Sequence, residues 1–216
     1  MGLAAPRGAG RLVIATVTSC PHCALPSFLS PRPSSLPPSG PEATFKGHNA
    51  AYEWALAQYL GAGVASCYRG DVPYWDDESQ AIATKWIAFY KRHRATLIQP
   101  IVHLKRPTMQ TWDGWMHVNP HRWTTRAQQT EADPRQRAAA AAEVGVAMLF
   151  NPTERSIVTN VWLPLYYTGL NSTAQIVLDE DAGGKATTAT LDRNYGVTIA
   201  LTMAPSSVHT VAVYAP

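Results

Sequence analysis

The alternation of apolar and polar residues is most regular near the end of the chain. Between residues 195 and 203, every second side chain is aromatic or aliphatic, and those between are small or polar. This alternation predicts an antiparallel strand with one buried face. That face consists of Tyr195, Val197, Ile199, Leu201 and Met203.

Other apolar runs in the same region are bounded by Pro, Gly, Asn or Asp, which predicts further short strands. We expect the run at 144–150 to pair with the next run, 156–163, across the turn between them. Several short antiparallel strands at regular spacing favour a β-sandwich. The remaining strands of this region are expected at 174–178, 187–191 and 208–214.

Two earlier segments are expected to open the sandwich. Residues 101–104 and 115–118 read as strands around a loop that Asp113 and Gly114 close as a turn pair. The segment 121–142 is rich in charged residues, Gln and Ala, and predicts a solvated excursion with one or two helical turns.

Upstream of residue 99 the apolar spacing is helical. A first helix is expected to start at Asn49 as N-cap and to end at Gly61 and Gly63. A second begins at the acidic residues 76–78 and ends at the basic residues 91–94, which suits the helix dipole. The apolar stripe of the first is Tyr52, Leu56, Tyr59 and Leu60, and that of the second is Ile82, Trp86, Phe89, Tyr90, His93 and Leu97.

Between these helices, residues 64–68 read as a strand buried on both sides, a type that needs parallel neighbours. Either this strand pairs with the later sheet, or the helix-strand-helix unit is part of a larger barrel or sheet, and we favour the second interpretation. The expected fold class is α+β, a partial (β/α) barrel end followed by an antiparallel β-sandwich. The expected domains are a disordered Pro/Ser-rich leader at 1–42, the barrel end at 43–99 and the sandwich at 100–216.

Cysteine spacing in the leader raises one redox alternative. Cys20 and Cys23 imitate a thioredoxin-type dithiol, and Cys67 stands alone. The reactive thiolate of such a dithiol requires a helix that begins at the first cysteine, and the prolines that follow forbid one. A chance C-x-x-C is the favoured interpretation.

Composition narrows the function classes. A net charge of +3 without a basic face does not predict nucleic-acid binding, and no apolar run approaches the roughly 20 residues of a membrane span. The apolar run at 12–17 is too short for a convincing signal peptide. Seven Trp and nine Tyr suit a protein that handles sugars, although core packing uses the same residues.

A series of short segments resembles one enzyme group. In order they read YEWALAQYLGAGVASCYRG, KWIAFYKRHRATL, HLKRP, DGWMHVNP, GVAMLFNPT, LPLYYTGL and LDRNYGVTIALTM. Over about residues 43–216 the chain resembles the C-terminal end of α-galactosidase-like glycoside hydrolases, whose (β/α)8 barrel precedes an antiparallel β-sandwich.

The resemblance implies carbohydrate as the ligand of the complete enzyme and a secreted or lysosomal location for relatives. A full barrel needs roughly 200 residues or more, and only 43–99 would belong to it here. Retaining glycosidases need two carboxyl groups about 5 Å apart, and in the resembled enzymes these lie on earlier barrel strands. We therefore expect no catalytic residue in this chain and a fragment that is inactive alone.

Three residues are candidates for binding sugar. Arg69, Asp71 and Trp75 follow the predicted strand at 64–68, at the end where barrel active sites lie. By position the two charged groups could bind sugar hydroxyls and Trp75, or its neighbour Tyr74, could stack on a ring. In the other interpretation the charged pair bind each other and the aromatics pack on the second helix.

No cofactor or metal is expected. His103 and His117 could face each other across a hairpin, but no third ligand accompanies them. Asn171 begins a glycosylation sequon that matters only on the secretory path. An alternative function is a non-catalytic sandwich that binds glycans or a protein through exposed Trp112, Trp115 and Trp123. The inner faces of the two helices should also leave an apolar patch suited to self-association.

Overall fold

The computed structural model describes residues 45–64 and 74–216. Two helices come first, α2 (Asn49–Gly61) and α3 (Asp77–Leu97), which confirms both helix predictions. The side chain of Asp76 accepts a hydrogen bond from the backbone N–H of Ser79, and the Ser79 hydroxyl accepts one from the N–H of Asp76. This reciprocal capping box fixes the start of α3. The N-cap of α2 is His48 rather than the expected Asn49.

Eight strands follow among the described residues, in two antiparallel sheets. The six-stranded sheet has the order β1-β2-β3-β8-β5-β6, and the two-stranded sheet pairs β4 with β7. The strands are β1 (Ile101–Lys105), β2 (Asp113–Val118), β3 (Glu143–Asn151), β4 (Ile157–Pro164), β5 (Thr173–Leu178), β6 (Ala186–Thr190), β7 (Gly196–Met203) and β8 (Ser207–Tyr214). The short helices are α4 (Arg126–Gln129), α5 (Pro134–Ala142), η1 (Tyr166–Thr168) and η2 (Glu180–Ala182).

One core lies between the two sheets and makes them a sandwich. Val161 and Leu163 of β4 and Val197 and Leu201 of β7 pack there against residues of the larger sheet such as Leu149. The alternation along β7 therefore points Val197, Ile199, Leu201 and Met203 inward, as predicted. Tyr195 was expected on the same face, but it precedes the strand and is exposed. The α+β class and the antiparallel sandwich are confirmed.

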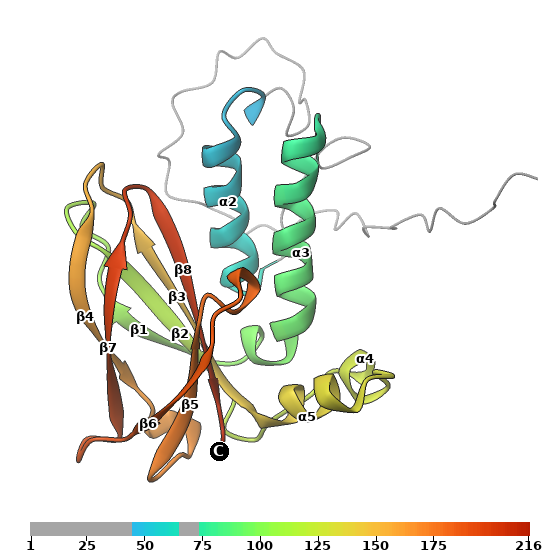
Figure 1. Ribbon diagram of the computed structural model, residues 1–216, viewed down its shortest axis with the longest axis vertical. Coiled ribbons are helices and arrows are strands. Elements are labelled where there is room, and N and C mark those ends of the chain that lie inside the picture. Colours follow the sequence, from blue (N-terminus) through green and yellow to red (C-terminus); the bar gives the residue numbers. More distant parts are fainter. Residues whose placement is uncertain (1–44, 65–73) are drawn as a thin grey trace, which may run out of the picture. The chain divides into compact units, whose positions relative to one another are not determined.

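A second core covers the other face of the larger sheet. Val146, Met148 and Phe150 of β3 point away from the sandwich interior and pack against α2 and α3. Every residue of β3 is buried, because helices cover one face and the second sheet the other. The described residues from α2 onward thus form three layers, helices, large sheet and small sheet (Figure 1).

This layering corrects the expectation that the inner faces of both helices are exposed. Tyr52, Leu56, Trp86 and Phe89 are each at most 3% exposed, because the outer face of β3 receives them. Self-association stays a prediction, but exposed inner helix faces no longer support it. The boundary at residue 99 also stays a prediction, although α2 and α3 share a core with the sandwich.

Two pairing expectations are wrong. The strand predicted at 144–150, here β3, pairs with β2 and β8, whereas β4 crosses to the other sheet and pairs with β7. Since β2 and β8 occupy both edges of β3, no edge is left for a hairpin to β4. Asp113 and Gly114 are not a turn but the first residues of β2, where Gly114 pairs with Leu149.

Several other predictions fall outside the described residues, namely the leader with Cys20 and Cys23, Cys67, and the strand expected at 64–68 except for Val64, which is exposed. In the part of the chain that the structure describes, no helix is long and apolar enough to cross a membrane.

Candidate functional site

Of the three predicted sugar-binding residues, the structure describes only Trp75. Arg69 and Asp71 lie outside the described residues. Trp75 immediately precedes the N-cap of α3, and its ring packs against that of Tyr52 with centroids 5.0 Å apart. Trp75 belongs to the core between helices and sheet. This ring contact is with the first helix rather than the second, and the binding role of all three residues stays a prediction.

A group of ionisable side chains surrounds the loop between β5 and β6, which carries Asp179, Glu180 and Asp181. Asp179 has a positive φ of 47° and is held by the facing strand. Its carboxylate accepts hydrogen bonds from the backbone N–H of Thr210 at 2.8 Å and from Nδ1 of His209 at 2.6 Å. The start of the loop is thereby fastened to β8.

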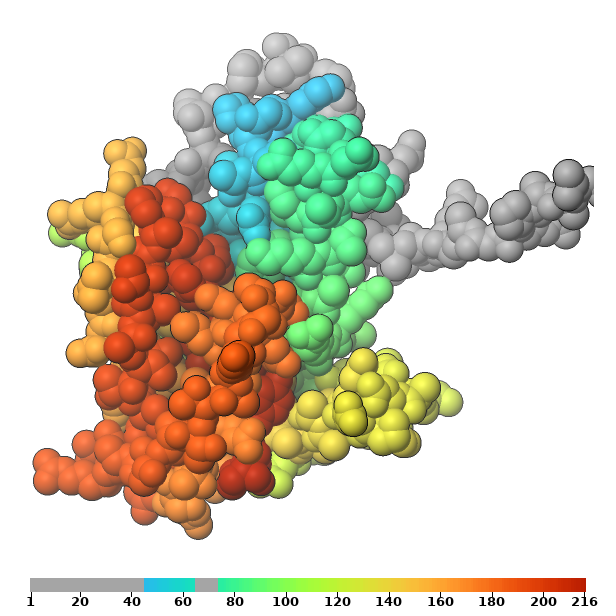
Figure 2. Space-filling model, in the orientation of Figure 1, coloured from blue at the N-terminus to red at the C-terminus, as the bar shows by residue number. Residues whose placement is uncertain are grey.

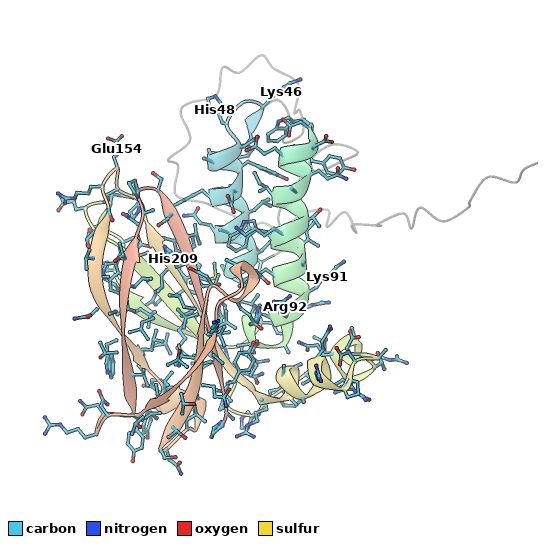
Figure 3. The ribbon with its side chains drawn as sticks, viewed as in Figure 1. Lys46, His48, Lys91, Arg92, Glu154 and His209 are labelled. Atoms are coloured by element: carbon cyan, nitrogen blue, oxygen red, sulfur yellow. The ribbon has the colours of Figure 1, made fainter. Side chains whose placement is uncertain are left out.

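The other two acids fasten the same loop to the helix layer and to the end of β8. Asp181 lies 2.6 Å from the guanidinium of Arg92 on α3, and Glu180 accepts a hydrogen bond of 2.7 Å from the hydroxyl of Tyr214. Arg92 and His209 are marked in Figure 3 on α3 and β8. The arrangement is a polar clamp that joins α3, the β5–β6 loop and β8.

A buried pair extends the clamp inward. Nδ1 of His93 on α3 lies 2.5 Å from the carboxylate of Glu143 on β3, and both side chains are at most 5% exposed. Glu143 is opposite Tyr214 in the β3–β8 register. Burial, then the charge of Glu143, raises the pKa of the Tyr214 hydroxyl, which keeps that hydroxyl a hydrogen-bond donor.

This geometry holds structure together and leaves little for acid-base chemistry. A glycosidase acid and its nucleophile must be free to meet the sugar on two sides. Asp179, Glu180 and Asp181 are instead occupied by His209, Tyr214 and Arg92. Each of the three carboxylates of the clamp is therefore engaged in a contact within the protein.

Ser207 adds a serine next to the His209–Asp179 pair. Its Oγ lies 3.3 Å from Nε2 of His209, an order of residues that resembles a nucleophile, base and orienting acid. The Ser207 hydroxyl, however, donates its proton to the carbonyl of Ala204 at 2.7 Å. A hydroxyl committed to a carbonyl is not activated by the histidine, so the geometry does not support nucleophilic catalysis.

The nearby hollow is small. It lies between α3, the β5–β6 loop and β8, has a volume of about 160 Å³ and is lined by Lys85, Trp86, Asp181 and Thr210 among others. Ligand pockets usually measure about 300–1,000 Å³. A wider depression of about 470 Å³ is a shallow dent among loops, with Glu154 as its acid.

Asp113 is the described carboxyl whose pKa is most suited to a general acid. Burial at the start of β2 raises its pKa to about 6, and the positive charge of Lys105 opposes that rise. Lys105 itself lies over the ring of Trp112 and bonds the hydroxyl of Thr111. A single carboxyl of this kind supplies half of a glycosidase pair.

The two strand histidines do not face each other. In the β1–β2 register His103 is opposite Trp115 and His117 is opposite Ile101. Both ring nitrogens of His117 lie within 3.2 Å of backbone carbonyls, those of Gln99 and Gly61, and burial lowers its pKa. Within residues 45–64 and 74–216, no group of three or more His, Cys, Asp or Glu could hold a metal ion.

The three tryptophans expected on the surface differ in exposure. Trp112 is buried, and its indole N–H donates to Thr159. Trp115 stacks on Phe150 between helices and sheet, and Trp123 alone of the three is well exposed. Asn171 of the sequon is exposed just before β5, and its glycosylation stays a prediction.

The clamp was missed in the sequence because its members are far apart along the chain, with Arg92 and Asp181 separated by 89 positions. The signals that could have indicated it were the acidic triplet after a strand and the basic end of α3. Charge complementarity alone does not select one such pair from many.

Comparison with known proteins returns solved structures only. No protein-family model matches the chain, and no curated protein matches it. A GH27 β-L-arabinopyranosidase from Geobacillus stearothermophilus, solved with arabinose, is 10% identical with a TM-score of 0.46, covering 78% of this chain and 31% of that one. A putative alpha-N-acetylgalactosaminidase from Bacillus halodurans C-125 is 13% identical with a TM-score of 0.44, covering 76% of this chain and 32% of that one.

The chain thus spans about a third of the length of these solved structures. Both are similar to it at low identity. No residue role transfers from them to this chain.

Proposed function

We propose that this chain is the C-terminal part of a carbohydrate-active glycoside hydrolase of the α-galactosidase-like type. In the complete enzyme, which hydrolyses O-glycosidic bonds, a barrel supplies the nucleophile and the acid/base. The chain itself supplies the end of that barrel and the sandwich, and it has no hydrolytic activity alone.

The first support is that the resembling segments fall on the central elements of the fold. KWIAFYKRHRATL lies on α3, DGWMHV is β2, GVAMLFN lies on β3 and VTIALTM lies on β7. These segments line both cores, so the resemblance concerns the residues that define the three layers.

The main support for the proposed inactivity is that the clustered carboxylates are already bonded to other side chains. Asp179, Glu180 and Asp181 are bound to His209, Tyr214 and Arg92, and Glu143 is buried against His93. A glycosidase would have to break these contacts to use any of the four.

Inactivity is tested with nitrophenyl α-galactoside, N-acetyl-α-galactosaminide and β-L-arabinopyranoside on the purified full chain. We expect no turnover above a mock preparation. Asp113→Asn and Asp179→Asn serve as controls, because they remove the acid with the raised pKa and the acid that pairs with His209 beside Ser207. Turnover that co-elutes with the chain and disappears in either variant would overturn the proposed inactivity.

Membership of a longer enzyme is tested on the transcript. An open reading frame that continues upstream of Phe45 with alternating strands and helices, and with two further carboxylates at strand ends, is expected. An untranslated sequence there would contradict a complete enzyme made from this gene.

The alternative function is a non-catalytic sandwich that binds glycans or a protein. The exposed aromatic side chains of the sandwich support it. Trp123 is exposed, but a larger group of exposed aromatic rings lies elsewhere, at one end of the β4–β7 sheet.

A further inference from the structure

Four exposed aromatic residues gather at one end of the two-stranded sheet. Trp162 is 43% exposed, Tyr166 63%, Tyr167 57% and Tyr195 42%. Tyr166 meets Tyr167 edge to face with centroids 5.3 Å apart, and it meets Tyr195 in the same manner at 5.7 Å. We call these four residues the aromatic group.

The group is held by buried neighbours. Leu165 is fully buried in the sandwich core and its N–H donates to the carbonyl of Tyr195, which joins η1 to the β6–β7 turn. The buried Thr168 hydroxyl donates to the carbonyl of Leu165 and closes η1 from below. Tyr166 and Tyr167 therefore project from a turn that buried Leu165 and Thr168 hold in place.

Trp162 is fixed on the outer face of the sheet by Gly196. A Cβ added at Gly196 would lie 2.2 Å from Nε1 of Trp162, so glycine allows the indole to lie directly on the backbone of β7. The indole N–H donates to Oδ2 of Asp192 at 3.0 Å. The backbone N–H of Gly196 and then Trp162 hold the pKa of Asp192 below its usual value, which keeps it a charged acceptor.

Tyr195 has a positive φ of 58°, a conformation that a bulky side chain rarely adopts. The turn holds it there because Oδ1 of Asp192 accepts the backbone N–H groups of Asn194 and Gly196. Glycine or asparagine would fit this backbone at lower cost, and a tyrosine in such a strained position points to a use for its ring. Figure 2 shows the β6–β7 turn, in red-orange, standing out from the surface.

Side chains with an apolar ring and a polar edge match the two sides of a pyranose sugar. The C–H face of the sugar packs on the ring, and its hydroxyls bind the polar edges and neighbouring acceptors. Here the three exposed tyrosines carry hydroxyls, and the carboxylate of Asp192 accepts the indole N–H of Trp162 beside them. We infer that the aromatic group of Trp162, Tyr166, Tyr167 and Tyr195 is a saccharide-binding surface that takes a neutral pyranoside.

A saccharide fits this surface better than a protein does. A stable protein interface covers about 800 Å² on each partner, far beyond four side chains, and its centre is usually apolar. The aromatic group contains no aliphatic residue and borders a charged carboxylate. Its rings are already ordered, which lowers the cost of holding a small ligand.

The surface differs from the site predicted around Trp75 and does not depend on the glycoside hydrolase proposal. The test uses the full chain and four methyl glycosides, those of galactose, N-acetylgalactosamine, glucose and mannose, measured by saturation-transfer NMR and by titration of tryptophan fluorescence. We expect at least one of them to bind.

Variants locate the binding. Replacing both Tyr166 and Tyr167 by alanine should weaken binding about tenfold or more, because two exposed rings are lost without opening the core. Trp162→Phe keeps a ring but loses the bond to Asp192 and should weaken binding less. Trp123→Ala removes a tryptophan of 60% exposure elsewhere and should leave binding unchanged. Melting temperatures confirm that each variant is folded.

Each contrary result is specific. Binding of none of the four glycosides overturns the inference, as does binding that survives loss of Tyr166 and Tyr167 or is lost in Trp123→Ala. Dimerisation that these two tyrosines cause in sedimentation, without sugar binding, would make the aromatic group a protein contact instead. None of these outcomes changes the hydrolysis test, so the two proposals fail separately.

Discussion

The two sheets of the sandwich share one core but differ in what covers their outer faces. The outer face of β3 is packed under α2 and α3, through Val146, Met148 and Phe150. The outer face of β4 carries Val158, at 82% exposure, and Trp162. One outer surface is thus a second core and the other is open.

This difference separates stability from recognition. Side chains on the covered face are held by close packing, so a change there costs free energy of folding. Side chains on the open face contribute little to folding and are available for a ligand. Four changes, taken from the largest expected effect to the smallest, test this division.

Removing a ring from the covered face should have the largest effect. Phe150 is 1% exposed, between Trp54 and Trp115, and Phe150→Ala should lower the free energy of unfolding by about 4 kcal/mol. Val158→Ala on the open face should change it by less than about 0.5 kcal/mol. Urea denaturation measures both, and equal losses would show that the helices do not pack on β3.

Breaking the buried pair comes next. Glu143→Ala leaves His93 without its partner and should destabilise the fold by about 3 kcal/mol. Replacing both residues by Leu should recover much of that loss, because an apolar pair needs no desolvation compensation. A double variant no more stable than the single one would show that the pair stabilises beyond its own contact.

A smaller, pH-dependent effect is expected at Asp113, whose pKa burial raises from 3.8 to about 6. The charged carboxylate disfavours the folded state, so the penalty is absent below pH 3.8, grows between the two values and is complete above about pH 6. Asp113→Asn should therefore gain about 1–2 kcal/mol at pH 8, after discounting for partial exposure, and nothing at pH 3.5. A gain that is equal at both pH values would exclude titration as its cause.

The smallest effect concerns the strained backbone on the open side. With a φ of 58° at position 195, Tyr195→Gly should be about 1 kcal/mol more stable than Tyr195→Ala, the reverse of the usual order. Thermal denaturation compares the two. Both should weaken sugar binding, since both lack the ring, and a stable variant that still binds would remove Tyr195 from the aromatic group.

Much of the fold could be predicted because its signals are local. The apolar stripe from Ile82 to Leu97 predicts a helix, and the alternation from Tyr195 to Met203 predicts a strand. The capping residues at the start of α3 are likewise read from a few neighbouring letters.

Pairing and coverage could not be predicted in the same way. The nine buried residues of β3 have two covered faces, but the sequence does not say that β2 and β8 are its neighbours or that α2 and α3 lie on it. The same limit applies to tryptophans, since Trp112 and Trp123 look alike in the sequence and only tertiary packing distinguishes them. The aromatic group was missed because Tyr166 and Tyr195 are distant along the chain and their rings meet only in the folded structure.

The position of β8 has a consequence for how the chain reaches its native state. β8 lies between β3 and β5, so β1-β2-β3 and β5-β6 remain separate ribbons until the last of the described strands is in place. Because joining them closes a loop of more than fifty residues, this step should be late and slow. A ribosome that stalls before residue 207 would leave the edges of β3 and β5 unpaired, and unpaired strand edges are prone to aggregation.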